Sequence, residues 1–185
     1  MEKEITINGL TFVPYISRDE IREQVSRVAG EIRRDLSGCE PVFLCVLNGS
    51  FIFAADLIRE VGIDDCHVCF VRYSSYEGMN SSGKIKQLIG LTEELEGKDV
   101  VIVEDIVDTG LTASNLMDDL RRRRPRSLRF ATLLHKPECT KTGFIPDYVA
   151  FSIHPRFIVG YGLDLDGKAR NLPDIYVIKE ETEDR

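Results

Sequence analysis

The sequence predicts one α/β domain over residues 1–185, built on a mainly parallel, twisted sheet that helices flank. The chain has 185 residues, of which 43% are hydrophobic, which is enough for a single compact core. Continuous apolar segments of strand length alternate with segments of helical period, and the order strand, helix, strand occurs twice. Strands that are apolar on both faces are typical of parallel sheets covered on both sides. Such sheets bind ligands at the carboxyl ends of their strands, so the loops there are the candidate sites.

The first half of the chain begins with an amphipathic helix. Ser17 and Glu20 stand at capping-box spacing, and the apolar residues that follow recur at helical period as far as Gly38. A strand, helix and strand come next, and they form the first parallel unit. These predicted elements are a buried strand at 41–47, a helix at 51–62 and a strand at 65–73.

The second half repeats this pattern and then changes character. An apolar strand, a polar loop, a helix and a further strand are expected at 100–103, 104–111, 112–123 and 127–135. Three shorter strand-like segments, separated by Pro and Gly turns, follow at 148–153, 157–162 and 174–179. We expect the region of about 148–178 to form a small flap over the same edge of the sheet.

Cysteine usage indicates reduced thiols. Five cysteines cannot all pair, which suits a reducing compartment. Cys66 and Cys69 are spaced like a metal or redox pair, but they lie in a strand-like segment and no second pair stands at zinc-ligand spacing. We therefore expect both to be structural.

Charge and hydropathy exclude some classes of protein. The net charge of -7 argues against broad electrostatic binding of nucleic acid, and the basic segment 121–126 is typical of a helix end or a subunit contact. No apolar segment approaches the roughly 20 residues that a membrane helix needs, and the first residues show no signal-peptide pattern. We expect a cytoplasmic protein with no membrane partner.

The segment VVIVEDIVDTGLTAS, residues 100–114, carries the clearest chemistry. Glu104, Asp105 and Asp108 precede a turn whose amides and hydroxyls, at residues 109–112, can bind a phosphate at a helix N-terminus. Gly110 lets the backbone come close to such an anion. Carboxylates repel phosphate but accept hydrogen bonds from a ribose diol, so a sugar phosphate would satisfy both halves. An acidic turn before an ordinary N-cap is the alternative, and the residues alone leave both open.

A second glycine-rich segment, GMNSSGKI at 78–85, is close to a P-loop. It has two glycines and Lys84, but Ile85 stands where a Ser or Thr hydroxyl should hold Mg²⁺. This pattern favours a mobile lid, about residues 74–84, over a nucleoside-triphosphate site.

The segment at 100–114 resembles the phosphoribosyl-pyrophosphate signature of the type I phosphoribosyltransferases. Its Glu-Asp followed by Asp-Thr-Gly resembles the 6-oxopurine branch, the hypoxanthine-guanine phosphoribosyltransferases. Four further segments resemble that family's other motifs in the same order, so the likeness covers nearly the whole chain. They are VLNGSFIF (pyrophosphate loop), RYSSYEG (mobile loop), LLHKP (base-binding lysine) and RFIVGYGLDLDGKARNLP (purine clamp and C-terminal segment).

The resemblance implies the type I phosphoribosyltransferase fold, with a hood formed by the chain termini, and roles for the residues of the signature. Glu104 and Asp105 would hold the ribose hydroxyls, directly or through Mg²⁺. Asp108 would be the general base that takes the proton from purine N7. The 5′-phosphate would lie in a cradle made by Asp108, Thr109, Gly110, Leu111 and Thr112.

The other motifs imply the remaining contacts. Lys136 would donate to the 6-oxo group, Phe157 would stack on the base, and the backbone of Ile158 would contact the purine edge. Asp164, beside the purine, would bind a second Mg²⁺. Pyrophosphate would contact Leu47, Asn48 and Gly49, through a non-proline cis peptide common in this family, together with Ser75, Tyr76 and Arg170.

The implied activity is purine salvage. The enzyme would transfer the phosphoribosyl group from phosphoribosyl pyrophosphate to N9 of hypoxanthine or guanine, giving IMP or GMP and pyrophosphate with Mg²⁺. A homodimer or homotetramer that binds no nucleic acid is expected. Two alternatives remain: a relative that prefers xanthine, and a nucleotide-sensing regulator that keeps the fold and binds RNA. Asn48 and Leu111 stand where some relatives carry basic residues, so backbone or solvent must make those contacts here.

Overall fold

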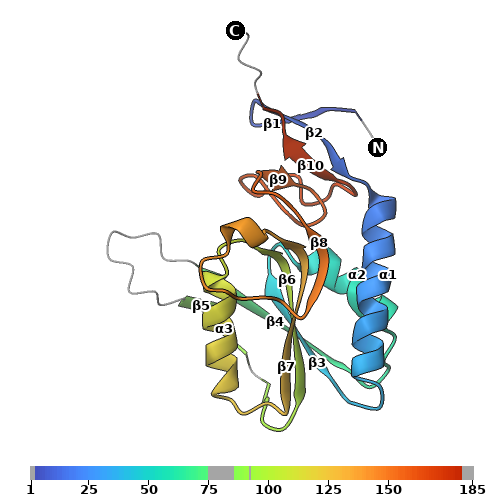
Figure 1. Cartoon of the computed structure of the whole chain (residues 1–185), viewed down its shortest axis with the longest axis vertical. Coiled ribbons are helices and arrows are strands. Elements are labelled where there is room, and N and C mark those ends of the chain that lie inside the picture. The colour runs from blue at the N-terminus through green and yellow to red at the C-terminus, as the bar shows by residue number, and fades with distance from the viewer. Residues whose placement is uncertain (1–2, 75–85, 92, 181–185) are drawn as a thin grey trace.

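A computed structural model describes residues 3–74, 86–91 and 93–180 of the chain (Figure 1). The predicted lid, about residues 74–84, lies outside the described residues except for Ser74, and so do Ser75 and Tyr76. The segment that resembles a P-loop, 78–85, also lies outside them.

The larger sheet has six strands in the order β5-β4-β3-β6-β7-β8. Strands β4, β3, β6, β7 and β8 are parallel to one another, and β5 is antiparallel to β4. The four strands predicted for this sheet are confirmed. The strands are β3 (Val42–Leu47), β4 (His67–Ser74), β5 (Lys86–Ile89), β6 (Asp99–Val107), β7 (Ser127–His135) and β8 (Tyr148–Ser152).

Helices cover both faces of this sheet, as the apolar strands predict. Figure 1 shows α1 (Arg18–Asp35) and α2 (Phe51–Val61) on one side and α3 (Leu111–Arg121) on the other. Successive residues of β3 face opposite layers, so Phe43 packs with α1 and α2 while Leu44 packs with α3. A short 3-10 helix, η1 (Pro137–Cys139), follows β7.

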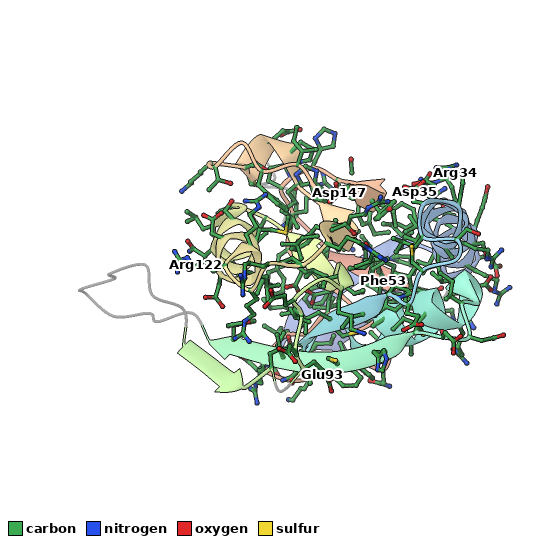
Figure 2. All side chains as sticks on the ribbon, turned by 90° about the horizontal axis from the view of Figure 1, so that it is seen from below. Arg34, Asp35, Phe53, Glu93, Arg122 and Asp147 are labelled. Atoms are coloured by element: carbon green, nitrogen blue, oxygen red, sulfur yellow. The ribbon has the colours of Figure 1, made fainter. Side chains whose placement is uncertain are left out.

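Side chains follow the same division between core and surface. In Figure 2, Phe53 points into the interior from α2, whereas Arg34 and Arg122 lie on the outer sides of the helix layers. The predicted capping box of α1 is present: Ser17 accepts from the backbone of Glu20, and the Glu20 carboxylate accepts from the backbone of Ser17.

A second sheet forms the hood above the carboxyl ends of the main strands (Figure 1). Its antiparallel strands have the order β1-β2-β10-β9. Asn8 and Gly9, both with positive φ, form the turn between β1 and β2. The strands are β1 (Ile5–Ile7), β2 (Leu10–Ile16), β9 (Ile158–Val159) and β10 (Ile175–Ile178).

The predicted flap, 148–178, wrongly includes the strand at its start, β8. Its first strand, β8, pairs parallel with β7, with Ala131 opposite Tyr148, and so belongs to the main sheet. Tyr148 and Ala150 are buried in the main core. A short apolar strand has the same sequence pattern in either sheet. The pattern therefore does not show to which sheet β8 belongs.

The strand predicted at 100–103 is longer than expected. β6 continues to Val107, so Glu104 and Asp105 lie in the strand and not in a loop. Pairing with β7 explains the extension, because Glu104 lies opposite Thr132 and Val107 opposite His135. Backbone hydrogen bonds form between paired strands whatever the side chains are, so acidic residues do not end a strand. Here they mark the part of β6 that extends beyond the apolar core.

The structure also bears on cysteine pairing, metal ligands and membrane spans. All five cysteines are free thiols, as predicted. Within the described residues, no group of three or more His, Cys, Asp or Glu side chains could hold a metal ion. No helix in the same part of the chain is long and apolar enough to cross a membrane.

Two polar contacts tie the hood to the helix layer. The buried Asp174, just before β10, accepts from the backbone N–H of Arg18 at 2.7 Å through Oδ1. This bond satisfies a first-turn amide of α1. Tyr161 donates its hydroxyl to Asp56 of α2 at 2.6 Å. The hood therefore has a fixed position over the edge where β3, β6 and β7 end.

Asp99 should make stability depend on pH at acidic values. Its buried carboxylate accepts from Arg126 and Ser127, and chiefly Arg126 lowers the pKa of Asp99 from 3.8 to about 2. A lowered folded-state pKa stabilises the fold above the unfolded pKa, and that contribution is lost as pH falls from about 4 toward 2, at most roughly 2 kcal/mol. Urea unfolding at several pH values should show a steeper loss for the wild type than for Asp99→Asn. Parallel curves would contradict this role.

Candidate functional site

The signature residues surround a small cavity at the carboxyl end of β6. Its volume is about 220 Å³. Strand residues and the first turn of α3 form its walls, which places a carboxylate side opposite a helix N-terminus. The lining residues are Glu104, Ile106, Val107, Asp108, Thr109, Gly110, Thr112 and Ala113.

Within the predicted phosphate loop, residues 108–112, Gly110 has φ +76° and stands directly before α3. No side chain caps this helix, because the capping position is a glycine. Leu111 N–H makes only a long bond, 3.4 Å, to the Thr109 hydroxyl. The first-turn amides of α3 therefore keep donor capacity for an anion, as the phosphate interpretation requires and an ordinary side-chain N-cap does not.

Glu104 and Asp105 form a pair of partly buried carboxylates on β6. Burial first, and then the adjacent Asp105 charge, raises the pKa of Glu104 well above its ordinary value. Burial likewise raises the pKa of Asp105, against hydrogen bonds from Glu104 and from the amide of Ile106. Two negative charges in so confined a place favour a ligand that brings protons or a cation.

Asp108 and Lys136 meet at the ends of two neighbouring strands. Val107 and His135 are opposite each other in the β6–β7 ladder, so the next residue of each strand emerges at the same place. Lys136 Nζ lies 3.0 Å from Asp108 Oδ2. The lysine is nearly buried, with 11% of its side chain exposed, whereas 47% of the Asp108 side chain is exposed. The pair thus presents a nearly buried donor beside an accessible acceptor.

The predicted pyrophosphate loop lies against the carboxylates. The peptide bond between Leu47 and Asn48 is cis, as the resemblance implies. A Cβ added to Gly49 would stand 1.5 Å from Asp105 Oδ2, and a Cβ added to Gly162 would stand 2.1 Å from the Gly49 carbonyl oxygen. Only glycine allows this approach of the loop to both β6 and the hood.

Arg170 and Asp164 form a salt bridge in the hood, with Nη2 and Oδ1 2.7 Å apart. Arg170 Nη1 also donates to the carbonyl oxygen of Gly162 at 2.6 Å. The Arg170 charge acts on Asp105 and opposes the rise in the pKa of that carboxyl. The hood arginine therefore lies near enough to Asp105 to influence its charge.

Phe157 and Ile158 also belong to the hood. Phe157 is 45% exposed, and its ring centroid lies 6.1 Å from that of Phe12 in β2. Ile158 is buried in β9, where it pairs with Val177. An exposed aromatic ring on a fixed strand end is suited to stacking on a planar base.

Sequence reasoning missed two residues that shape the site. Thr140 contacts the backbone of Asp108 and Lys136, and the 32 positions that separate it from Asp108 leave no local pattern to reveal the contact. Gly162 has φ +101° and approaches Gly49 closely. The spacing of glycines 160 and 162 was a signal for that turn.

A larger cavity, of about 850 Å³, lies between α1, α2 and the hood. Its lining does not include the signature carboxylates. Two of its arginines already have partners, since Arg33 donates to the carbonyl of Val61 and Arg59 pairs with Asp56. The chemistry of the signature therefore belongs to the smaller cavity.

The residues present fit a Mg²⁺ ion. Glu104 and Asp105 offer carboxylate oxygens, which Mg²⁺ prefers, and a cation would favour the charged carboxylates that burial disfavours. Gly49 leaves space beside Asp105 that a Cβ would fill. Asp164, the other predicted metal ligand, is paired with Arg170, so it would have to leave that partner. Substrate oxygens and water would complete the coordination of an ion held by two carboxylates.

Comparison with known proteins identifies the family. The profile of the Phosphoribosyl transferase domain matches residues 17–166. A hypoxanthine-guanine phosphoribosyltransferase of Streptococcus pneumoniae is 40% identical over 169 residues, which is 90% of this chain and 92% of that protein. A hypoxanthine-guanine-xanthine phosphoribosyltransferase of Tritrichomonas foetus is 37% identical over 168 residues, 89% of this chain and 90% of that protein.

A solved structure agrees with these relatives. The crystal structure of a hypoxanthine-guanine phosphoribosyltransferase from Bacillus anthracis superposes with a TM-score of 0.85 at 43% identity, covering 90% of this chain and 98% of that one. The chain that has this sheet order, hood and signature cavity is therefore similar to these proteins over about 90% of its length. The chain belongs to the phosphoribosyltransferase family, in the branch of the hypoxanthine-guanine phosphoribosyltransferases, and is a transferase.

Proposed function

We propose that this enzyme transfers the 5-phosphoribosyl group from phosphoribosyl pyrophosphate to N9 of hypoxanthine or guanine, releasing IMP or GMP and pyrophosphate. The Lys136–Asp108 pair carries the proposal. A 6-oxopurine has O6 and N7 side by side on one edge, and this pair offers a donor beside an acceptor 3.0 Å away. The names of the relatives support the same substrates.

The base would enter between these two residues and the hood. Lys136 would turn from Asp108 to donate to O6, which frees the Asp108 carboxylate to accept the N7 proton as N9 attacks C1′ of the ribose. The exposed ring of Phe157 would stack on the purine, with the backbone of Ile158 at its edge. Proton acceptance at N7 leaves N9 with the electron pair that forms the new bond.

The phosphoribosyl group would occupy the small cavity. The open amides of the segment 109–112 would hold the 5′-phosphate at the start of α3, and Glu104 and Asp105 would accept from the ribose hydroxyls. Pyrophosphate would then lie against the loop 47–49 with Arg170 nearby, where the backbone is closely packed and cannot easily shift. Positive charge develops at C1′ of the ribose as its bond to the leaving pyrophosphate breaks. The neighbouring carboxylates therefore stabilise the transition state.

We propose Mg²⁺ as the cofactor, held by Glu104 and Asp105, with Asp164 as the ligand of a second ion. When bound, Mg²⁺ neutralises charge on the leaving pyrophosphate. A chain of net charge -7 particularly needs this to bind so anionic a substrate. A cytoplasmic location, supported by the five free thiols, and a homodimer or homotetramer remain predictions.

Two other activities are distinguishable. A xanthine preference is worth testing because one relative's name includes xanthine. A regulator that binds RNA is disfavoured by the retained Lys136–Asp108 pair, which such a role does not need. Pyrophosphate release should be measured with hypoxanthine, guanine, xanthine and adenine, with Mg²⁺ and after its removal by EDTA. A gel shift with RNA completes the comparison, and RNA binding without any pyrophosphate release would overturn the proposal.

Asp108→Asn should lower kcat by about 10² to 10⁴ while the affinity for phosphoribosyl pyrophosphate stays close to that of the wild type. The amide keeps the size of the side chain but cannot take a proton from N7. Single-turnover kinetics would isolate the chemical step, and calorimetric titration would give the affinity. An unchanged rate of that step would remove Asp108 from the role of general base.

Adenine should be rejected relative to hypoxanthine by roughly 10⁴ in kcat/KM. The lysine ammonium has only donors, so the 6-amino group would face it donor to donor. Lys136→Gln, whose amide offers a donor and an acceptor, should narrow that ratio by lowering hypoxanthine turnover. Comparable turnover of both bases by the wild type would refute the 6-oxopurine assignment.

Gly49→Ala should raise KM for phosphoribosyl pyrophosphate about tenfold or more, because its Cβ overlaps the Asp105 carboxylate and displaces either the loop or the acid. Gly30→Ala is the matched control. Gly30 lies within α1 with nothing within 4 Å of an added Cβ, so that variant should keep KM and gain about 0.5–1 kcal/mol of stability. Equal KM values for both variants would disprove the close-approach role.

A further inference from the structure

The loops that follow β6 and β7 are joined by more than the Lys136–Asp108 salt bridge. Lys136 N–H donates to the Val107 carbonyl at 2.9 Å, and Lys141 N–H donates to the Thr109 carbonyl at 2.9 Å. The segment that follows η1 therefore lies beside the phosphate loop, with Lys141 bonded to Thr109. A displacement of either loop would move the other.

Thr140 lies at the centre of this junction. Its hydroxyl is 3.5 Å from the Asp108 carbonyl oxygen and 3.4 Å from the Lys136 carbonyl oxygen. Its methyl group also faces the phosphate loop, since Cγ2 lies 3.4 Å from the position of a Cβ on Gly110. One side chain thus contacts the backbone carbonyls of the proposed base and of the proposed purine donor, and it lies beside Gly110 of the phosphate loop.

His135 determines how that hydroxyl is oriented. Its Nε2 lies 3.2 Å from Thr140 Oγ1, and burial lowers the pKa of His135, which keeps the ring neutral at physiological pH. A threonine hydroxyl has one proton, and a carbonyl oxygen can only accept. If that single proton is shared between the two carbonyl oxygens, none remains for the imidazole, so Nε2 must donate to Thr140 Oγ1, with Nδ1 unprotonated.

We propose that Thr140, oriented by His135, is a positioning residue that fixes the backbone of Asp108 relative to that of Lys136. The inference rests on the proposed transferase function. Neither side chain touches substrate in this arrangement; both act through the two residues that do. An error of about 1 Å in the placement of reacting groups can cost 10²-fold in rate, so the junction should affect the chemical step more than substrate binding.

Thr140→Val removes the hydroxyl and keeps the shape, and it should lower kcat about tenfold with little change in KM for phosphoribosyl pyrophosphate. Thr140→Ser should restore kcat, because it keeps the hydroxyl. Thr132→Val is the matched control: its buried hydroxyl donates to the Leu134 carbonyl in the same strand, so it should alter stability and not kcat. Equal kcat in wild type and Thr140→Val would overturn the proposal, as would a Ser variant no better than Val.

The histidine provides an independent arm. His135→Gln retains a donor at the Nε2 position and should keep kcat near wild type, whereas His135→Leu should match Thr140→Val. The double variant His135→Leu/Thr140→Val should be no slower than either single variant. Both substitutions break the same junction, so the second removes nothing more. Additive losses would show two separate effects and contradict the proposal.

A readout without activity separates this inference from the proposed function. ¹⁵N NMR of the imidazole in the free enzyme should show His135 protonated at Nε2, and Thr140→Val should change that signal. A ring protonated at Nδ1 instead would mean that Thr140 donates to the histidine and leaves the carbonyls, which overturns the junction whatever the assay gives. If the wild type is inactive but His135 has the expected tautomer, the transferase function and the predicted loss of kcat are contradicted. The contact between His135 and Thr140 is not.

Discussion

The parallel pairing of β6 with β7 is the constraint on which the rest of the site depends. The register places Val107 opposite His135, so that Asp108 and Lys136 leave the sheet together and form a 3.0 Å ion pair. A slip of one residue would send these side chains to opposite faces. Such a slip would also exchange the β6 residues that pack on the two helix layers, because alternate residues of this strand belong to different core clusters. Core packing thus determines the geometry of the Lys136–Asp108 pair.

Electrostatics explains why the signature combines acids with an anion site. Glu104 and Asp105 stay partly buried at the cost of raised pKa values, while the uncapped start of α3 offers donors a few residues further along. A ligand with hydroxyls or a cation on one side and a phosphate on the other satisfies both. The glycine contact between Gly49 and Asp105 brings the third part of the site, the loop after β3, against the same carboxylates.

Much of the core could be predicted from local pattern, because helix caps and apolar strands are local signals. β7 has the predicted bounds, and α1 has the predicted capping box. The continuation of β6 through Glu104 to Val107 could not be predicted, since pairing with a neighbouring strand decides it and the polar side chains suggest a loop. β8 was assigned to the wrong sheet because its apolar pattern suits both. The hairpin turn at Asn8 and Gly9, by contrast, has a local sequence signal, because Asn-Gly favours the positive φ that both residues adopt.

The individual site residues are predictable from motif resemblance, whereas local chemistry alone fits both a phosphate loop and an ordinary N-cap. The structure adds what no motif contains: the approach of Gly162 to Gly49, and the contact of Thr140 with Asp108 across 32 positions. Such contacts depend on how distant loops pack. The most direct test of the central claim is a crystal structure with a 6-oxopurine nucleotide bound. We expect Lys136 Nζ within hydrogen-bond distance of O6 and an Asp108 carboxylate oxygen beside N7; a base bound elsewhere, with the Lys136–Asp108 pair intact, would contradict the claim.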